Sequence, residues 1–468
     1  MGTIAARTIS QHKLNETVIV GKDVLELLSS AMYVDPLCIY REYIQNAADA
    51  IDEAQSEGLY SKNATPRIDV SINVAERSIK IRDNGIGIPP NAFARRLTSL
   101  GASKKRGSNA RGFRGVGRLS GLAYCQQLIF RSKSRSGSRV WEVRWDCRRL
   151  KELLNDHHFV GDLNEIIYES VEFDTFEDPK CLPHFFEVEL RTVNRIKGDV
   201  LLNEAGVANY LSQVAPVPFA EDFSFGKRIS AYLRKQGVGA SYKIFVNSSD
   251  NAVCRLFKNT FAAKQTLSDK FADLEFFEVP ALNGGHDAVG WILHHNYYGA
   301  LPDKLGIKGL RLRLGNVQIG SDGILESTFP EPRFNAWAVG EIHILSPRLL
   351  PNGRRDDLEQ SVHQQNLLNH IIPYAKRIAK LCRAKSRERH IQRQPPGALS
   401  NYNFNLQQLL TSRQKRLLAK LPKRKATAYK EVFEMLLRFS SSEQASRLIP
   451  RILCGLLELD SQATTQRN

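Results

Sequence analysis

The chain has 468 residues, of which 42% are hydrophobic and 25% are charged, and its formal net charge is +17 at pH 7. This composition is typical of a soluble globular protein, and it excludes disordered, fibrous and membrane-spanning chains. At about 150 residues per domain, the length predicts about three domains. The basic balance permits contact with nucleic acid or another acidic partner, but charge alone identifies no ligand.

Hydropathy and cysteine usage predict a cytoplasmic protein with no membrane partner. No apolar run reaches the roughly 18 residues that a membrane-spanning helix needs, and the N-terminal segment lacks the apolar core of a secretion signal. The 7 cysteines occur singly, with no CxxC pair. This pattern argues against a disulfide framework and against a zinc site, and it favours a reducing compartment.

The first part of the chain, residues 1–198, predicts helices packed on one mixed, mostly antiparallel sheet, which is an α+β fold. A helix is expected over residues 35–55, where Asp35 and Pro36 form a start signal. Segments that alternate apolar and polar residues, as half-buried strands do, follow at residues 67–74, 77–85, 127–134, 138–146 and 185–193.

Two further regions follow. Residues 199–358 predict a second α/β domain, with strands within 242–247, 288–295, 309–320 and 338–345. Residues 359–468 predict a basic helical C-terminal region, interrupted by a linker at Pro395, Pro396 and Gly397. Its Lys and Arg side chains could contact nucleic acid phosphates, but a solvated helix face is the favoured interpretation, because basic runs are commonly solvated.

Glu42, Asn46 and Asp49 form the first candidate site. At about 100° per residue, they fall within about 60° of one another on one face of the predicted helix. A carboxylate and a carboxamide one turn apart can polarise a water molecule and hold a hard cation such as Mg²⁺. An ordinary amphipathic helix with a solvated face would give the same pattern.

Asp83 ends a predicted strand and is followed by Asn84, Gly85, Ile86 and Gly87. The carboxylate there could accept a hydrogen bond from an exocyclic amine such as that of adenine. The glycines would let the backbone approach a flat ring closely. A tight hairpin turn of the Asn-Gly type is an equally good interpretation.

Gly112, Gly115 and Gly117 lie in a glycine-rich segment, GFRGVGR, between two predicted strands. Their backbone N–H groups could face phosphate oxygens, and the start of a following helix would add a favourable dipole. The segment is neither a Walker loop nor part of a Rossmann unit. Taken alone, it is weak evidence for a phosphate site.

In this order and spacing, the three motifs together resemble the GHKL ATPase superfamily, which contains gyrase, heat-shock protein 90, histidine kinases and MutL. The segments most similar to the heat-shock protein 90 family are REYIQNAADAID and GFRGVGRLSG. The resemblance implies a Bergerat-fold site for ATP and Mg²⁺, closed by a lid over residues 95–118. It implies these roles: Glu42 as general base, Asn46 on Mg²⁺, Asp83 on the adenine amine beside Gly87, Asp49 supporting the nucleotide through water, and Gly112, Gly115 and Gly117 over the phosphates.

One position departs from the family pattern, and a second segment extends the resemblance. A threonine near the adenine is usual on a late strand, whereas this chain has Phe186 there. The S5-like middle domain of the family is resembled by residues 308–360, where matching Asn352 implies that Arg355 reaches the γ-phosphate, with Arg354 as a rival. A surface loop whose Arg-Arg-Asp-Asp charges pair with one another is the alternative.

Two functions follow from the resemblance. The leading hypothesis is an ATP-hydrolysing, heat-shock-protein-90-like chaperone with lid closure, middle-domain docking, a protein client or partner, and a possible homodimer. The alternative is a DNA-associated clamp or remodelling ATPase similar to the MORC or MutL branches. The charge of +17 and the basic C-terminal region favour the alternative. An arginine where those branches usually place a lysine favours the chaperone.

Overall fold

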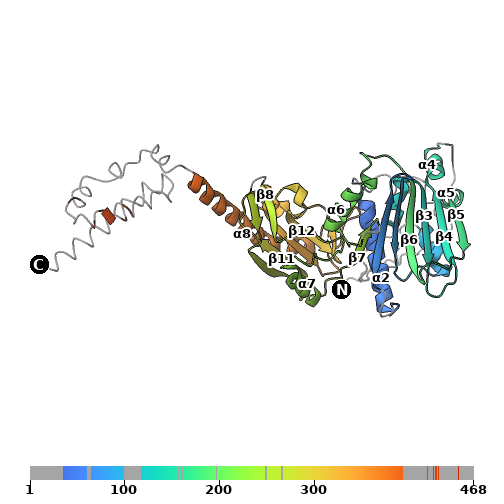
Figure 1. The fold of residues 1–468 in the computed structure, drawn as a ribbon, viewed down its shortest axis with the longest axis horizontal. Helices are drawn as coiled ribbons and strands as arrows, with labels where there is room; N and C mark the ends of the chain where they lie inside the picture. Colours follow the sequence, from blue (N-terminus) through green and yellow to red (C-terminus); the bar gives the residue numbers. More distant parts are fainter. Residues whose placement is uncertain are drawn as a thin grey trace, which may run out of the picture. The chain divides into compact units, whose positions relative to one another are not determined.

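A computed structural model describes residues 35–60, 65–99, 117–156, 158–159, 162–196, 198–247, 250–264 and 267–393, with isolated positions at 419, 425, 427, 428, 431 and 452 (Figure 1). The chain divides into two compact units, Met1–Ser386 and Arg387–Asn468. Both large sheets and every residue discussed below as part of a site lie in the first unit. The predicted α+β class, with helices and a mixed, mostly antiparallel sheet, is confirmed.

The first sheet has seven strands in the order β5-β4-β3-β6-β2-β1-β7. Its strands are β1 (Arg67–Asn73), β2 (Ser78–Asp83), β3 (Cys125–Lys133), β4 (Val140–Asp146), β5 (Val171–Phe176), β6 (Phe185–Val193) and β7 (Lys243–Val246). Neighbours are antiparallel except β1 and β7, which are parallel. Because β7 comes from beyond residue 198, the sheet draws on both sides of the predicted domain boundary, and the domain limits themselves stay predictions.

Helix α2, which carries Glu42, Asn46 and Asp49, packs on this sheet (Figure 1). The helical elements around the sheet are α2 (Cys38–Ser56), α3 (Pro90–Thr98), η1 (Gly117–Ala123), α4 (Cys147–Asn155), α5 (Leu163–Ser170), η2 (Val200–Leu202) and α6 (Glu204–Val214). The start of α2 is Cys38 rather than Asp35, because the Asp35 carboxylate accepts a hydrogen bond from the Leu37 N–H in a preceding turn. The predicted apolar face, including Tyr40, Ile44 and Ile51, enters the core.

The second sheet has five strands in the order β10-β11-β14-β12-β13. Its strands are β10 (Asp273–Pro280), β11 (His286–His294), β12 (Gly309–Leu314), β13 (Val317–Ile319) and β14 (Val339–Ile344), beside the hairpin β8 (Thr260–Lys264) and β9 (Leu267–Lys270). The helical elements are α7 (Gly226–Lys235), η3 (Asp303–Leu305), η4 (Glu326–Thr328), η5 (Pro332–Trp337) and α8 (Val362–Arg393). Leu367, Ile371 and Ile378 of α8 pack into the core of this sheet. No described helix has the length and apolar character needed to cross a membrane.

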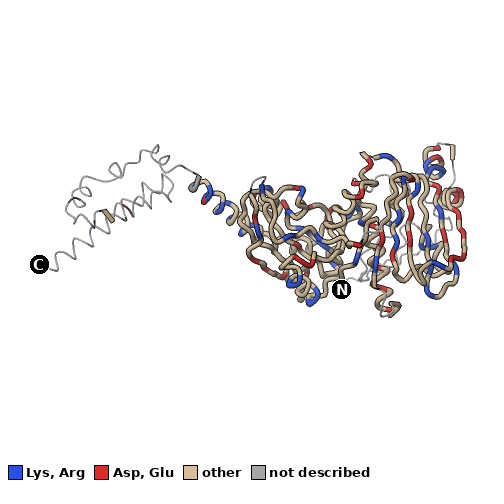
Figure 2. Tube along the Cα trace, in the orientation of Figure 1, with Lys and Arg blue, Asp and Glu red and all other residues tan. Residues whose placement is uncertain are grey.

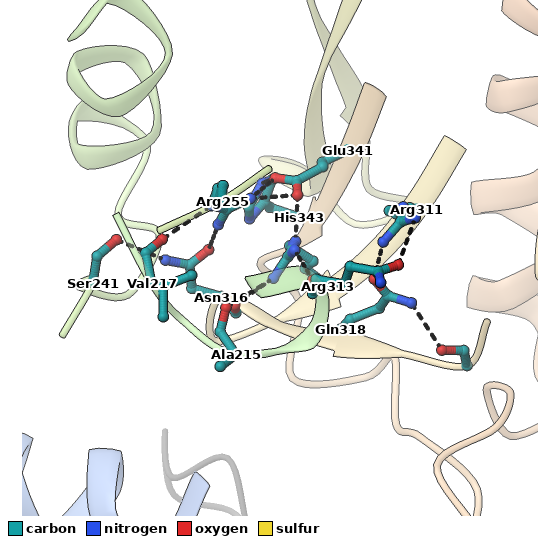
Figure 3. Close-up of polar contacts among 12 residues, drawn as sticks. Ala215, Val217, Ser241, Arg255, Arg311, Arg313, Asn316, Gln318, Glu341 and His343 are labelled. Atoms are coloured by element: carbon teal, nitrogen blue, oxygen red, sulfur yellow. Dashed lines mark hydrogen bonds and ion pairs between the residues drawn. The ribbon is translucent and has the colours of Figure 1, made fainter. Parts of the chain in front are cut away.

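A buried charge cluster joins the second sheet to the segment between α6 and β7 (Figure 3). Glu341 on β14 forms ion pairs with Arg255 and with Arg313 of β12, whose Nε lies 2.6 Å from Glu341 Oε1. The Arg255 Nε–H donates to the Val217 carbonyl at 3.1 Å, and the Asn316 side chain donates to the Ser241 hydroxyl at 3.2 Å. The segment that leads into β7 is therefore tied to the second sheet by buried charges and hydrogen bonds.

Candidate functional site

The polar face of α2 is buried, which removes the solvated-face interpretation. Glu42 is 4% exposed and Asp49 is 8% exposed, while Asn46 is half-buried. Within the described residues, Glu42 Oε1 accepts no hydrogen bond. A buried carboxylate oxygen without a donor is costly for folding, so its presence points to a functional demand at this position.

Asp83 ends β2, as predicted, and its loop is packed onto α2. The buried carboxylate accepts a hydrogen bond from the Gly85 N–H at 2.8 Å. A Cβ atom on Gly85 would lie 2.7 Å from the Ala50 carbonyl carbon, and the Ile86 N–H donates to the Ala50 carbonyl at 3.0 Å. Since the chain continues from this loop into α3, the Asn-Gly hairpin turn is not formed. Burial raises the pKa of Asp83 to about 7.

Gly87 anchors the other end of the same loop to the sheet. Its φ is +72°, and a Cβ atom there would lie 2.2 Å from the Lys133 carbonyl oxygen, so a side chain has no room. The Ser132 hydroxyl accepts from the Ile88 N–H at 2.7 Å and donates to the Phe185 carbonyl at 3.0 Å. The loop is thus fixed against β3 and β6, at the edge where Asp83 ends its strand.

Phe186 stands in the row of the sheet between Asp83 and Ser132. Strand pairing places Phe186 opposite Asp83 on one side and opposite Ser132 on the other. Its ring stacks on Phe130, with centroids 5.9 Å apart and 27° between the planes. The position at which the heat-shock protein 90 family has a threonine is therefore aromatic here, and a hydroxyl group is present one strand away.

Gly117 brings the end of the glycine-rich segment against α2. A Cβ atom at residue 117 would lie 2.2 Å from Glu42 Oε2. Residue 117 begins η1, which is held to α2 by a hydrogen bond of 2.9 Å from the Gly121 N–H to the Tyr43 hydroxyl. Gly112 and Gly115 lie outside the described residues.

The predicted lid, residues 95–118, is described only at its two ends, and Arg118 connects them. The Arg118 guanidinium donates a hydrogen bond to the Ser99 carbonyl. Burial lowers the pKa of Arg118 to about 10, with a smaller contribution from the positive charge of Arg96. This contact was not predicted, because the sequence does not show which of the many basic residues in the segment turns inward.

Arg355 reaches Glu42 from a loop that follows the second sheet. The Asn352 N–H donates to the Asp357 carbonyl at 2.9 Å, which closes the loop. Arg355 Nε lies 3.5 Å from Glu42 Oε1, and its Nη1 donates a hydrogen bond to Gln45 Oε1. The structure therefore places Arg355 beside Glu42. The alternative, in which the Arg-Arg-Asp-Asp charges pair only with one another, does not hold for the Arg355 guanidinium.

Arg354 contributes to the same junction through its backbone. Its side chain is exposed, whereas its carbonyl oxygen accepts a hydrogen bond of 3.3 Å from Arg41 Nη2. Neither Arg41 nor Gln45 was singled out from the sequence. Helical spacing was the available signal, because Gln45 lies three residues after Glu42 and hence on a neighbouring part of the helix surface.

The donor set fits a metal held mainly by a nucleotide. The described residues contain no group of three or more His, Cys, Asp or Glu side chains that could hold a metal ion by themselves. Asn46 offers one carboxamide oxygen on the polar face of α2, between Glu42 and Asp49. Mg²⁺ keeps several waters and commonly takes one or two protein ligands together with substrate phosphates, so Asn46 is a suitable single ligand.

Helices lie on a seven-stranded, mostly antiparallel sheet, and the Asp83 loop and the start of η1 pack on one polar helix. This arrangement is consistent with the fold of the GHKL ATPases. Residues 39–171 match the family described as histidine kinase-, DNA gyrase B-, and HSP90-like ATPase. The predicted resemblance to the GHKL superfamily and to the heat-shock protein 90 family is thus confirmed for this part of the chain.

Similar proteins include chaperones of the heat-shock protein 90 family. "Chaperone protein HtpG" of Helicobacter hepaticus is 28% identical over 135 residues, which are 25% of this chain and 22% of the relative. HtpG of Acinetobacter baylyi is 28% identical over 139 residues, 26% of this chain and 22% of the relative. HtpG of Buchnera aphidicola subsp. Cinara cedri is 35% identical over 95 residues, 19% of this chain and 15% of the relative. The chain thus matches about a fifth of the length of these chaperones or less.

Proposed function

We propose that the protein is an ATP-hydrolysing molecular chaperone similar to heat-shock protein 90, in which ATP drives lid closure and docking of the middle region. The family of residues 39–171 supports ATP binding and hydrolysis in general. The observation that carries the finer proposal is the junction at Glu42, where Gly117 abuts one carboxylate oxygen and Arg355 lies 3.5 Å from the other. A base, a phosphate-facing glycine and a cation are the parts that phosphoryl transfer to water needs.

In this proposal, Glu42 is the general base and Arg355 stabilises the transferred phosphoryl group. Glu42 Oε1 accepts no hydrogen bond from the described residues, so it can accept one from an attacking water molecule. The Arg355 guanidinium is permanently charged and has a fork geometry that suits phosphate oxygens. Its place beside Glu42 puts the cation next to the point where charge develops.

The remaining predicted residues bind the nucleotide. Asp83, in its ionised form, accepts a hydrogen bond from the adenine amine beside Gly87, and Asp49 supports the nucleotide through water. Gly117, together with Gly112 and Gly115, presents backbone N–H groups to the phosphates. Asn46 holds Mg²⁺, which neutralises phosphate charge when bound.

The wider role includes a protein client or partner and a possible homodimer, as proposed from the HtpG relatives. A cytoplasmic location is part of the same proposal.

ATP turnover tests the proposal directly. The Glu42→Ala variant should lose turnover while still binding ATP, and Arg355→Ala should slow hydrolysis with little change in nucleotide affinity. Arg354→Ala is the matched control, because its exposed side chain is adjacent in sequence, and it should turn over ATP at the wild-type rate. Undiminished turnover by Glu42→Ala would reject the assignment of the base, and a loss confined to Arg354→Ala would move the cation to that residue.

One observation supports the DNA-associated alternative. Lys376 and Lys380 are exposed on α8, and Lys and Arg recur along this helix (Figure 2). Turnover should therefore be measured alone, with an unfolded protein and with duplex DNA. Stimulation by the unfolded protein supports the chaperone, whereas stimulation by DNA that falls steeply with added salt supports a clamp or remodelling ATPase.

A further inference from the structure

Gln45 is a buried polar residue of α2 that the proposed reaction does not yet use. It lies one turn after Arg41 and Glu42, and it is only 1% exposed. Its carboxamide oxygen accepts a hydrogen bond from Arg355 Nη1. This contact joins α2 to the loop after the second sheet, so it forms only when these two regions are folded together.

The backbone of Arg355 is fixed from several directions. Its φ is +57°, its N–H donates to the Asn352 carbonyl at 3.2 Å, and its carbonyl accepts from the Gly320 N–H at 2.9 Å. A Cβ atom on Gly320 would lie 2.6 Å from the Asp356 carbonyl oxygen, so the loop sits closely on the end of β13. The long side chain of arginine still has several rotatable bonds, and a partner at its far end is needed to select one conformation.

A neutral partner suits a cation that must act beside a base. If the Arg355 guanidinium donated a hydrogen bond to Glu42, it would occupy the oxygen that has to accept a proton from water. Instead, its Nε lies 3.5 Å from Glu42 Oε1, close enough for charge attraction, while its Nη1 is taken by Gln45. The carboxamide is neutral, so it orients the guanidinium without adding a second negative charge beside it.

We propose that Gln45 is a positioning residue, which holds the Arg355 guanidinium beside Glu42 without neutralising it and without letting it block the carboxylate. The inference rests on the proposed ATPase function. Gln45 would act only through Arg355. Because Gln45 is neutral, it would position the cation without carrying a charge of its own.

The test compares Gln45→Met and Gln45→Asn with wild type in steady-state turnover and nucleotide binding. Methionine keeps the volume and removes the acceptor, and asparagine keeps the amide and withdraws it by one methylene group. Both variants should reduce kcat on the order of tenfold, the effect of losing one hydrogen bond to a charged group. Nucleotide affinity should change little, because Gln45 acts through Arg355, and loss of the Arg355 side chain is itself expected to change nucleotide affinity little. Gln55→Met is the matched control, on an exposed position of the same helix.

A double-mutant cycle separates positioning from a general structural effect. In an Arg355→Ala background, the Gln45 substitutions should cause no further loss, since their target is gone. Wild-type kcat in the single variants, or losses that multiply with that of Arg355→Ala, would overturn the inference. If Gln45→Met does not fold, the more conservative Gln45→Asn decides. If Arg355→Ala itself leaves turnover unchanged, the proposed role of Arg355 fails first, and that result is recognisable without any Gln45 variant.

Discussion

Gly117 and Glu42 are in direct contact: a Cβ atom at residue 117 would lie 2.2 Å from Glu42 Oε2. The other carboxylate oxygen, Oε1, faces Arg355 Nε at 3.5 Å. The candidate base is therefore bounded by the end of the glycine-rich segment on one side and by the middle-region arginine on the other. A displacement of either neighbour should change the position of the carboxylate.

The Gly117→Ala variant should lose most of its turnover and keep its fold. The added methyl group displaces the flexible end of a side chain and no backbone atom, so the cost in stability should be small. A carboxylate displaced by about 1 Å can lower kcat on the order of a hundredfold. Steady-state turnover and a thermal melt measure the two effects.

Gly137→Ala is the control for this substitution. A Cβ atom there would meet its nearest neighbour, the Ser134 carbonyl oxygen, at 3.5 Å, which is an ordinary contact. Wild-type turnover by Gly117→Ala would show that Glu42 is not the base or that its position is not critical.

Nucleotide affinity should rise with pH across neutrality because of Asp83. Burial raises the pKa of this carboxylate to about 7, so a substantial fraction is protonated in the unliganded protein at neutral pH. An amine donor forms a stronger hydrogen bond with the ionised carboxylate than with the neutral acid, so protonation of Asp83 should weaken ATP binding. Titration calorimetry between about pH 6 and pH 8 should show weaker ATP binding at the acid end.

Asp83→Asn supplies the control for the pH profile. The variant should bind ATP more weakly than wild type. Its ATP affinity should also lack the part of the pH dependence that comes from ionisation of the carboxylate. Protonation of the phosphate chain affects both proteins equally, so the difference between the two profiles isolates Asp83. Identical pH profiles for wild type and variant would contradict the proposed contact with the adenine amine.

The spacing of apolar and polar residues predicted those features of the candidate site that lie within a single helix or strand. Alternation of apolar and polar residues located β1 to β4 and β6, and Asp83 lies at the end of its strand as expected. Helical spacing placed Glu42, Asn46 and Asp49 on one face of α2. The elements could be predicted because the spacing of apolar residues and the end of a strand are properties of short segments, while the roles of these residues stay predictions.

Contacts between distant segments could not be predicted in the same way. Gln45 reads as an ordinary polar helix residue until Arg355, far along the chain, is placed beside it. The alternation in GLRLRL is typical of a half-buried strand, yet Arg311 and Arg313 are both buried. Arg313 is compatible with the interior because Glu341 of β14 supplies a counter-ion and backbone carbonyls accept its other N–H groups, and these neighbours come from distant segments.

Glu341→Gln should destabilise the protein strongly. The substitution keeps the shape and removes the negative charge that faces Arg255 and Arg313, so two buried cations lose their counter-ion. Breaking a buried ion pair in this way costs about 3 kcal/mol or more in the free energy of unfolding, which urea denaturation measures. Glu331→Gln is the control, because its ion pair with Arg383 is at the surface and its loss should change stability little. Equal urea midpoints for the two variants would show that the buried charge cluster around Glu341 does not stabilise the protein.

Stability should also fall as the pH is lowered from about 6.5 towards about 4, because of His343. Burial lowers the pKa of this imidazole to about 4, only partly offset by Glu341 at 3.2 Å, so the folded protein keeps it neutral. In the unfolded chain it takes up a proton near its ordinary pKa of 6.5, and this uptake favours unfolding in the interval between the two values. Urea midpoints measured across that interval should therefore decline with acidification. His343→Gln should reduce the decline, and His286→Gln, at a side chain that is 40% exposed, should leave it as in wild type. An unchanged decline in His343→Gln would assign the acid sensitivity to other groups.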